Sequence, residues 1–119
     1  MEREDRTATE PLSHEEFVRV DMRAGRILSA EPLTKARIPA YALTVDLGPL
    51  GVKKSSARIT DLYRAEDLPG RLVVAVVNFP PKRIAGFVSE VLVLGVGDAA
   101  GRVALLRPDA EVPLGARIY

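Results

Sequence analysis

The sequence predicts an all-β domain with short helices, in which five strands close into a barrel. Apolar and polar residues alternate through the first half of the chain, and two continuous β-branched runs follow in the second half. The five predicted strands are residues 21–33, 41–47, 52–59, 72–77 and 91–96. A short helix over 61–68, capped by Thr60, is predicted between the third and fourth strands. This order is the layout of the OB-fold, a five-stranded, partly open barrel.

The chain opens with polar residues that show no hydrophobic period, which predicts a flexible tail over 1–12 and a folded domain over 13–119. Ser13 and Glu16 have the spacing of a capping box, in which each side chain bonds the backbone N–H of the other residue. This pair predicts a short N-terminal helix that runs to about Val18.

Gly25 interrupts the long first strand. A glycine inside a strand often marks a bulge or a sharp bend, which a small barrel needs in order to curl its first strand. We therefore expect Gly25 at such a bend, where a β-branched residue would oppose a positive φ or a close backbone approach. Additional C-terminal strands are predicted at 102–106 and 116–119, separated by turns at Pro108 and Pro113.

Composition limits the possible classes of protein. A chain of 119 residues, 47% of them hydrophobic, can form one domain with its own core. The absence of cysteine excludes disulfides and thiolate chemistry. No apolar run approaches the ~20 residues of a membrane-spanning helix, and the charged start lacks the apolar centre of a secretory signal. We therefore expect a cytoplasmic protein without membrane insertion.

The net charge of +1 hides an asymmetry along the chain. Residues 1–16 carry six acids and two arginines, a net charge of −4, so the remaining 15 basic and 10 acidic residues give the body +5. A moderately basic body is compatible with a polyanionic partner.

Candidate catalytic residues are few. The single histidine, His14, lies inside the capping box, where a solvated role at the helix start is expected. No metal-ligand spacing and no glycine-rich phosphate loop is present. Ser89 and Glu90 could act as nucleophile and base, but no third, orienting group is apparent. The sequence therefore predicts no enzyme, no metal site and no cofactor.

Residues 78–90 join the two buried strands of the second half and contain a basic pair, Lys82-Arg83. Pro80 and Pro81 cannot donate ladder hydrogen bonds, so this segment is predicted to be a stiff loop that continues neither strand. Arginine presents a planar fork to phosphate, and lysine acts as a point charge. Binding residues often lie on such loops.

Four other side chains of this segment have two interpretations each. Asn78 can pin the loop backbone or contact a base, and Ser89 can hold the loop or donate to phosphate. Phe79 and Phe87 can stack on exposed bases or pack in the core of a barrel that is poor in aromatic residues.

Three basic clusters fall on the face that an OB-fold uses for ligands, which is formed by strands 2 and 3 and two loops. They are Lys35/Arg37, Lys53/Lys54 and Lys82/Arg83. Because successive residues of a strand point to opposite faces, only one of Lys53 and Lys54 can face a ligand.

The segment from Asn78 to Gly95 closely resembles the tRNA-binding domain family, and specifically its CsaA branch. The wider family shows Asn-Leu-Lys-Pro-Arg-Lys, a spacer, and Ser-Glu-Gly-Met; six residues match, Asn78, Pro81, Lys82, Arg83, Ser89 and Glu90. Four residues depart from this pattern in a way that points to the CsaA branch: Pro80, Ala85, Val91 and Leu92. The resemblance extends from about Phe17 to the C-terminus, through 23–27 and 55–60.

The resemblance implies a non-catalytic, homodimeric OB-fold protein that recognises the shape and phosphates of tRNA. The RNA-binding residues expected on this basis are Lys35, Arg37, Lys53, Lys54, Asn78, Lys82, Arg83 and Ser89. The alternative that the family implies is an export-related chaperone that binds unfolded polypeptides through an exposed apolar groove. A scaffold that contacts a synthetase or another protein is a third hypothesis.

Overall fold

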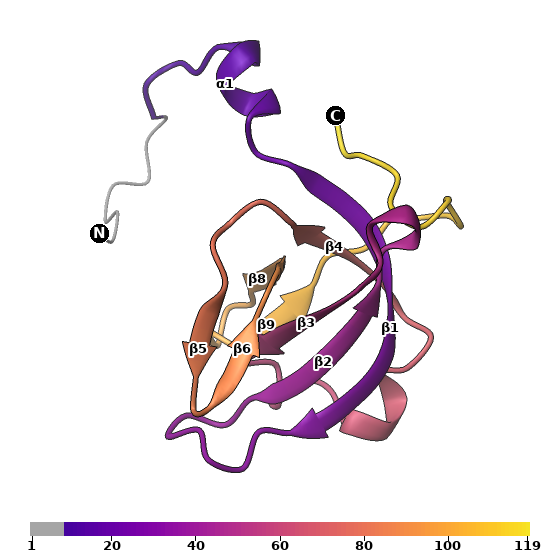
Figure 1. Cartoon of the computed structure of the whole chain (residues 1–119). Coiled ribbons are helices and arrows are strands. Elements are labelled where there is room, and N and C mark those ends of the chain that lie inside the picture. Colours follow the sequence, from indigo (N-terminus) through magenta and orange to yellow (C-terminus); the bar gives the residue numbers. More distant parts are fainter. Residues whose placement is uncertain (1–8) are drawn as a thin grey trace.

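The computed structural model describes residues 9–119, and its main feature is a β-barrel (Figure 1). One five-stranded antiparallel sheet has the order β3-β2-β1-β4-β7, and two hairpins, β5-β6 and β8-β9, complete the molecule. The bounds are α1 His14–Val18, β1 Met22–Pro32, β2 Tyr41–Asp46, η1 Gly48–Leu50, β3 Val52–Ala57, η2 Ala65–Asp67, β4 Leu72–Val76, β5 Lys82–Ile84, β6 Phe87–Ser89, β7 Leu92–Val93, β8 Gly95–Gly97 and β9 Val103–Leu105. The predicted OB-fold barrel is thereby confirmed.

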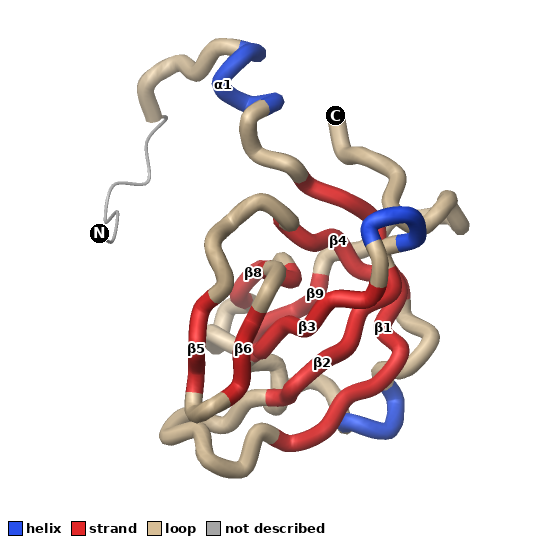
Figure 2. Tube along the Cα trace, in the orientation of Figure 1, coloured by secondary structure: helices blue, strands red, loops and turns tan. Residues whose placement is uncertain are grey.

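The N-terminal segment stands off the barrel (Figure 2). The predicted capping box is present, since the Glu16 amide donates to Ser13 Oγ and the Ser13 amide donates to Glu16 Oε1, both at 3.0 Å. None of the residues of α1 is buried. Residues 9–12 of the predicted tail are exposed coil, and residues 1–8 lie outside the described part. No helix among residues 9–119 is long and apolar enough to cross a membrane.

The barrel core is aliphatic. β2 alternates buried and half-buried residues along its whole length, and β4 is buried on nearly every position, as expected for its β-branched run. The largest fully buried side chains are Ile27, Leu43, Val45, Leu47, Leu68 and Val73. No phenylalanine belongs to this core, so of the two interpretations of Phe79 and Phe87, packing in the core is excluded.

The irregularity of β1 is not at Gly25. Gly25 pairs regularly with Val73 of β4, and the register shift against β2 falls between Ile27 and Ser29. The φ angle of Gly25 is not positive, but other side chains do approach its backbone closely, as expected. A Cβ on Gly25 would lie 2.7 Å from Val45 Cγ1 and 2.8 Å from Leu47 Cδ2. Gly25 is therefore required by packing, and the bulge is at Leu28.

The helix predicted over 61–68 is reduced to the 3₁₀ turn η2. Arg64, which precedes η2, has an extended conformation with ψ 144°. The carbonyl of Tyr63 accepts a hydrogen bond from Tyr41 Oη at 2.7 Å, and the Asp67 amide, which would bond it in an α-helix, donates to the Arg64 carbonyl instead. The Tyr63 hydroxyl in turn accepts from the Leu105 amide at 2.9 Å. These tertiary bonds override the local helical preference.

The predicted strand 91–96 is divided into β7 and β8. At Gly95 a Cβ would lie 2.9 Å from the Ala104 carbonyl oxygen, so only glycine fits where β8 pairs with β9. β9 confirms the strand predicted at 102–106. The predicted strand 116–119 is only a single bridge, between Arg117 and Arg23 of β1.

Residues 78–90 are not a simple loop, because they contain the hairpin of β5 and β6. The turn of this hairpin consists of Ala85 and Gly86, with φ values of 51° and 81°. Two central residues with positive φ are typical of the tight turns that match the twist of paired strands. The two prolines restrict only the residues before β5, so Lys82–Ile84 can pair with β6.

Candidate nucleic-acid interface

The hairpin, defined as residues 82–89, is fastened to the free edge of β3 by its last side chain, Ser89, and by Glu90, which follows it. The Ser56 amide donates to Ser89 Oγ at 3.0 Å, and the Lys54 amide donates to Glu90 Oε1 at 2.9 Å. The Glu90 amide donates back to the Lys54 carbonyl at 2.7 Å. These bonds satisfy backbone groups that an edge strand would otherwise expose. Ser89 and Glu90 thus hold the hairpin on the barrel and do not form a nucleophile and base.

Asn78 holds the other end of the segment. Its Oδ1 accepts from the Asp21 amide at 3.0 Å, and its Nδ2 donates to the Arg19 carbonyl at 2.7 Å. The side-chain amide therefore pins the end of β4 to the chain that enters β1. Of the two interpretations of Asn78, the structure shows the backbone contact.

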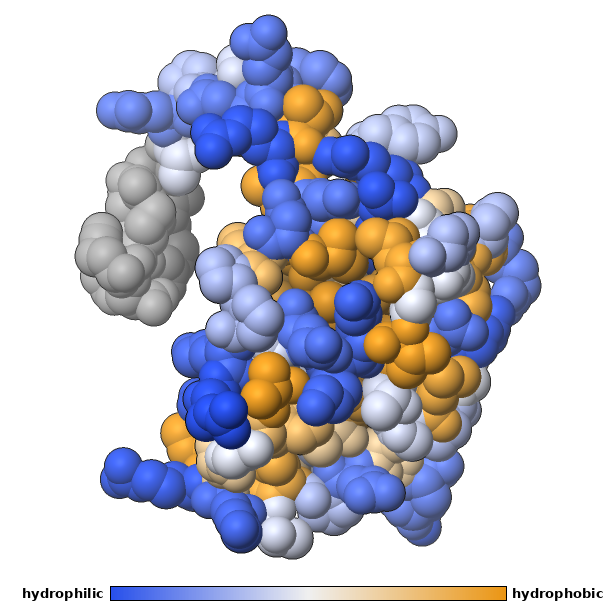
Figure 3. Space-filling model, viewed as in Figure 1, coloured by the Kyte–Doolittle hydropathy of each residue, from blue (hydrophilic) through white to orange (hydrophobic). Residues whose placement is uncertain are grey.

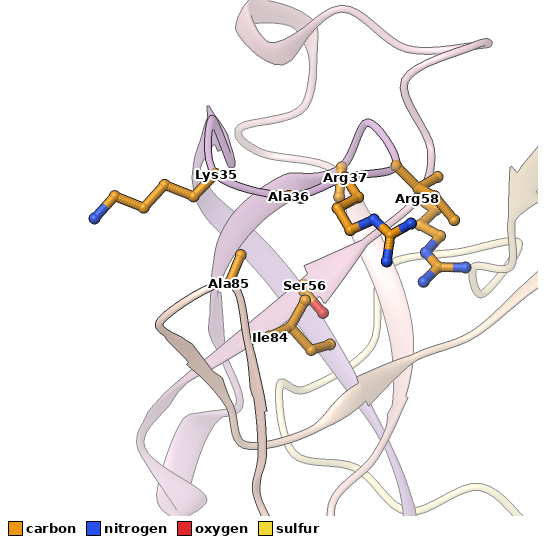
Figure 4. A pocket seen from close by; sticks show the side chains of 9 residues that line it. Lys35, Ala36, Arg37, Ser56, Arg58, Ile84 and Ala85 are labelled. Atoms are coloured by element: carbon orange, nitrogen blue, oxygen red, sulfur yellow. The ribbon is translucent and has the colours of Figure 1, made fainter.

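Three hollows share lining residues one with the next, and together they are called the groove; the hairpin lines the first two of them. The first has a volume of about 650 Å³ and is lined by Lys35, Arg37, Ile38, Ser56, Arg58, Ile84 and neighbouring alanines. Figure 4 shows the guanidinium groups of Arg37 and Arg58 pointing to the same side of it, while Lys35 extends outward. The first hollow thus presents cations around an apolar floor.

The second and third hollows continue this groove. The second, of about 340 Å³, shares Ser56 and Ile84 with the first and contains Lys82. The third, of about 350 Å³, shares Phe79, Glu90 and Val91 with the second and contains Lys53. Each hollow therefore has at least one cation in its wall. On the face seen in Figure 3, hydrophilic and apolar residues are interspersed.

The structure divides the predicted site residues into two sets. Those that line the groove are Lys35, Arg37, Lys53, Lys82 and Ser89. Lys54, Asn78 and Arg83 line none of the three hollows. Lys54 places its Nζ 5.5 Å from the centre of the Phe87 ring, and Arg83 alternates with Lys82 on β5 and so points to the opposite side of the hairpin.

Arg58 is a groove residue that the sequence analysis missed. It follows β3 and lies in the wall of the first hollow next to Ser56. The two-residue period of the strand, counted from Lys54 through Ser56, could have indicated this position.

The basic residues also differ in their partners. Arg23, Arg26, Arg64, Arg102 and Arg117 each lie within ion-pair distance of a carboxylate. Within residues 9–119, the cations that line the groove have no such partner: Lys35, Arg37, Lys53, Arg58 and Lys82. Unpaired cations can bind an anion without first breaking an internal ion pair. The groove is thus suited chemically to a polyanion.

Apart from Glu16, whose pKa is lowered by its capping-box bonds to Ser13, the groups with shifted pKa values belong to the ion pairs. A hydrogen bond from Arg23 is the largest influence on the Asp21 carboxyl and lowers its pKa; burial opposes this shift, and the charges of Arg23 and then Arg117 add to it. Backbone hydrogen bonds, first from Arg102, lower the pKa of Asp98. Among the described residues, no group of three His, Cys, Asp or Glu side chains could hold a metal ion.

Comparisons of the sequence and of the structure with known proteins indicate the same family. The family described as "Putative tRNA binding domain" matches residues 22–117. The structure of the chaperone CsaA from Bacillus anthracis superimposes with a TM-score of 0.87 and 52% sequence identity, over 92% of this chain and 100% of that one. The structure of the CsaA chaperone protein from Picrophilus torridus superimposes with a TM-score of 0.84 and 43% sequence identity, over 92% of this chain and 100% of that one.

Curated relatives of this chain include much longer proteins. A methionine--tRNA ligase from Thermococcus kodakarensis is 39% identical over 109 residues, which are 92% of this chain and 14% of the ligase. The chain thus spans about one seventh of the length of the ligase it matches. The family match over most of the chain and the two CsaA structures agree. The chain therefore belongs to the tRNA-binding domain family, in its CsaA-type branch.

Proposed function

We propose that this protein binds tRNA without catalysing a reaction, and that the groove contacts RNA phosphates. The observation that carries the proposal is the row of cations in the groove that have no carboxylate partner within residues 9–119. Phosphate contacts position an RNA without reading its sequence. RNA helices are recognised largely through backbone and 2′-hydroxyl groups, so a few placed cations suffice.

The salt dependence of tRNA binding tests this proposal. Replacing Arg37 and Arg58 by alanine should weaken the binding of total tRNA and reduce the log-log salt slope by about 1 for each lost phosphate contact. The folded protein should persist, because exposed charges contribute little to stability. A matched control is the double alanine variant of Arg64 and Arg102, which loses the same charge from residues already paired with Glu66 and Asp98. Equal slopes in the two variants would overturn the role of the groove.

Lys82 and Arg83 offer a second comparison on the same hairpin. They were predicted to act together, but Lys82 lines the second hollow and Arg83 lines none of the three. We expect Lys82→Ala to weaken tRNA binding more than Arg83→Ala does, with similar losses across tRNA species. The reverse order would place the RNA on the other side of the hairpin.

A homodimer is part of the proposal. Apolar side chains outside the barrel are exposed, among them Leu12, Val18, Val20 and Tyr119. Single exposed apolar residues are ordinary, but a set on a segment that stands off the barrel favours an interface. A specific interface would bury about 800 Å² per subunit.

The second candidate function is the binding of unfolded polypeptide, favoured by the 52% identity to a structure described as the chaperone CsaA. The groove walls contain apolar side chains, including Ile84, Val91 and Leu92. Competition distinguishes the two candidates: an unfolded protein that displaces tRNA from the groove with little salt dependence would support the chaperone. Failure to compete would favour RNA.

A further inference from the structure

We propose that the groove holds an unpaired nucleotide of the RNA, with its base stacked on Phe79. This inference rests on the proposed function and specifies the RNA segment, which is single-stranded at this point. The slot is the space on either side of the Phe79 ring, in the second and third hollows.

Phe79 is available for stacking because it is not used by the core. Its side chain is 51% exposed and lies outside the core cluster. An aromatic side chain exposed among basic residues is the usual platform on which unpaired bases stack. From the sequence, Phe79 could either stack on a base or pack in the core. Its exposure excludes packing in the core.

The backbone around Phe79 is held in place before any ligand arrives. On one side, the side-chain amide of Asn78 bonds Asp21 and Arg19, and the Val77 amide donates to the Asp21 carbonyl at 2.9 Å. On the other side, Pro80 and Pro81 fix their φ angles. A fixed platform loses little conformational entropy on binding, which favours affinity.

Phe79 forms a wall shared by two hollows, and each of these contains a lysine without an ion-pair partner among residues 9–119. Lys82 lies in the second hollow and Lys53 in the third. A nucleotide chain that passes Phe79 has one phosphate before the stacked base and one after it. The two lysines are therefore placed to meet these phosphates. The hollows lie at the small end of the ~300–1,000 Å³ range of ligand pockets.

Glu90 indicates which part of the nucleotide enters the slot. It lines both hollows, and its Oε1 is occupied by the Lys54 amide at 2.9 Å. A carboxylate repels phosphate, so the space beside it favours the uncharged base. The neighbouring Val91 and Leu92 are apolar, and Leu92 is 44% exposed. A base inside an RNA helix is already stacked on both faces and cannot enter, which restricts the occupant to unpaired RNA.

The chain has three tyrosines but no tryptophan, so Phe79→Trp introduces a single tryptophan in the slot, whose fluorescence can be excited selectively. The probes are an unstructured oligoribonucleotide of about eight nucleotides, within the site size of OB-folds, a fully paired RNA duplex, and total tRNA. We expect the oligoribonucleotide and tRNA to quench this fluorescence and the duplex to leave it unchanged. Leu62→Trp is the control reporter, because Leu62 is also exposed and lines none of the three hollows.

Phe79→Ala supplies the matching affinity measurement. It should weaken oligoribonucleotide binding about 5- to 150-fold, the range found for single stacked bases, and leave the salt slope unchanged because no charge is removed. If tRNA binds with a strong salt slope but Phe79→Trp is not quenched and Phe79→Ala binds normally, the stacking slot is wrong and the proposed function stands. If no RNA binds even at low salt, both fail. If unfolded polypeptide changes the reporter and RNA neither changes it nor binds, the occupant is a polypeptide and both are overturned.

Discussion

Because Gly25 has no side chain, β1 can pack closely against Val45 of β2 and against Leu47, which follows β2. We expect Gly25→Ala to destabilise the protein by about 1–3 kcal/mol, because the added Cβ would overpack against Val45 and Leu47, both fully buried. Urea denaturation measures the loss. Gly97→Ala is the control, since nothing lies within 4 Å of a Cβ there, and its φ is not in the left-handed region. Equal stability of the two variants would contradict the packing argument.

Asp21 gives a pH dependence with a definite sign. Its pKa is lowered from the ordinary value of 3.8, first by the hydrogen bond from Arg23. A carboxyl with a depressed folded pKa stabilises the protein above its unfolded pKa, and this stabilisation is lost as the pH falls through the folded value. We therefore expect Asp21→Asn to be less stable than wild type at neutral pH.

The stability difference between wild type and Asp21→Asn should narrow as the pH falls below 3.8. Urea midpoints of both proteins across this range provide the measurement, and the pairwise comparison removes the titration of the other carboxyls. A difference that stays constant, or widens in acid, would show that Asp21 does not stabilise through its charge.

Among the elements, the hairpin depends most on bonds from outside itself. Ser89→Ala removes the acceptor of the Ser56 amide and the bond from Ser89 Oγ to the Val91 carbonyl. A part-buried donor left without a partner costs about 1–3 kcal/mol. We expect this loss in urea denaturation, together with faster hydrogen exchange at the Ser56 amide.

Ser29→Ala is the control for this prediction. It removes a hydroxyl bond to Thr44 on the face of β1 and β2, at 2.6 Å, without touching the hairpin. Exchange at the Ser56 amide should remain slow in this variant. If Ser89→Ala leaves that exchange unchanged as well, the hairpin is held by other contacts. Ser89 would then not be needed to position Lys82.

For the whole molecule, the proposed homodimer is the hypothesis that follows least directly from one chain. We expect wild type to be dimeric at micromolar concentration and Val18→Asp to shift it toward monomer, because a charge on an apolar interface loses solvation. Sedimentation equilibrium measures both. Leu62→Asp, on an exposed apolar residue of the barrel, is the control. A monomeric wild type would refute the dimer.

Several features of this protein follow from local sequence alone. The capping box of α1 depends on two residues three positions apart, and the strands β1 to β4 follow from local alternation or continuous runs of apolar residues. The family was recognisable because its motif is a set of residue types at fixed spacing within one short segment. These predictions needed no information about distant partners.

Tertiary structure decided the features that depend on distant partners. The helix over 61–68 was lost because the Tyr63 carbonyl bonds Tyr41, 22 residues away. The segment 78–90 became a hairpin because Ala85 adopts a positive φ that its residue type does not suggest. The way the hairpin docks on β3 likewise determines which side chains line the groove. Arg58, which was not predicted, lines it, and Arg83, which was predicted, does not.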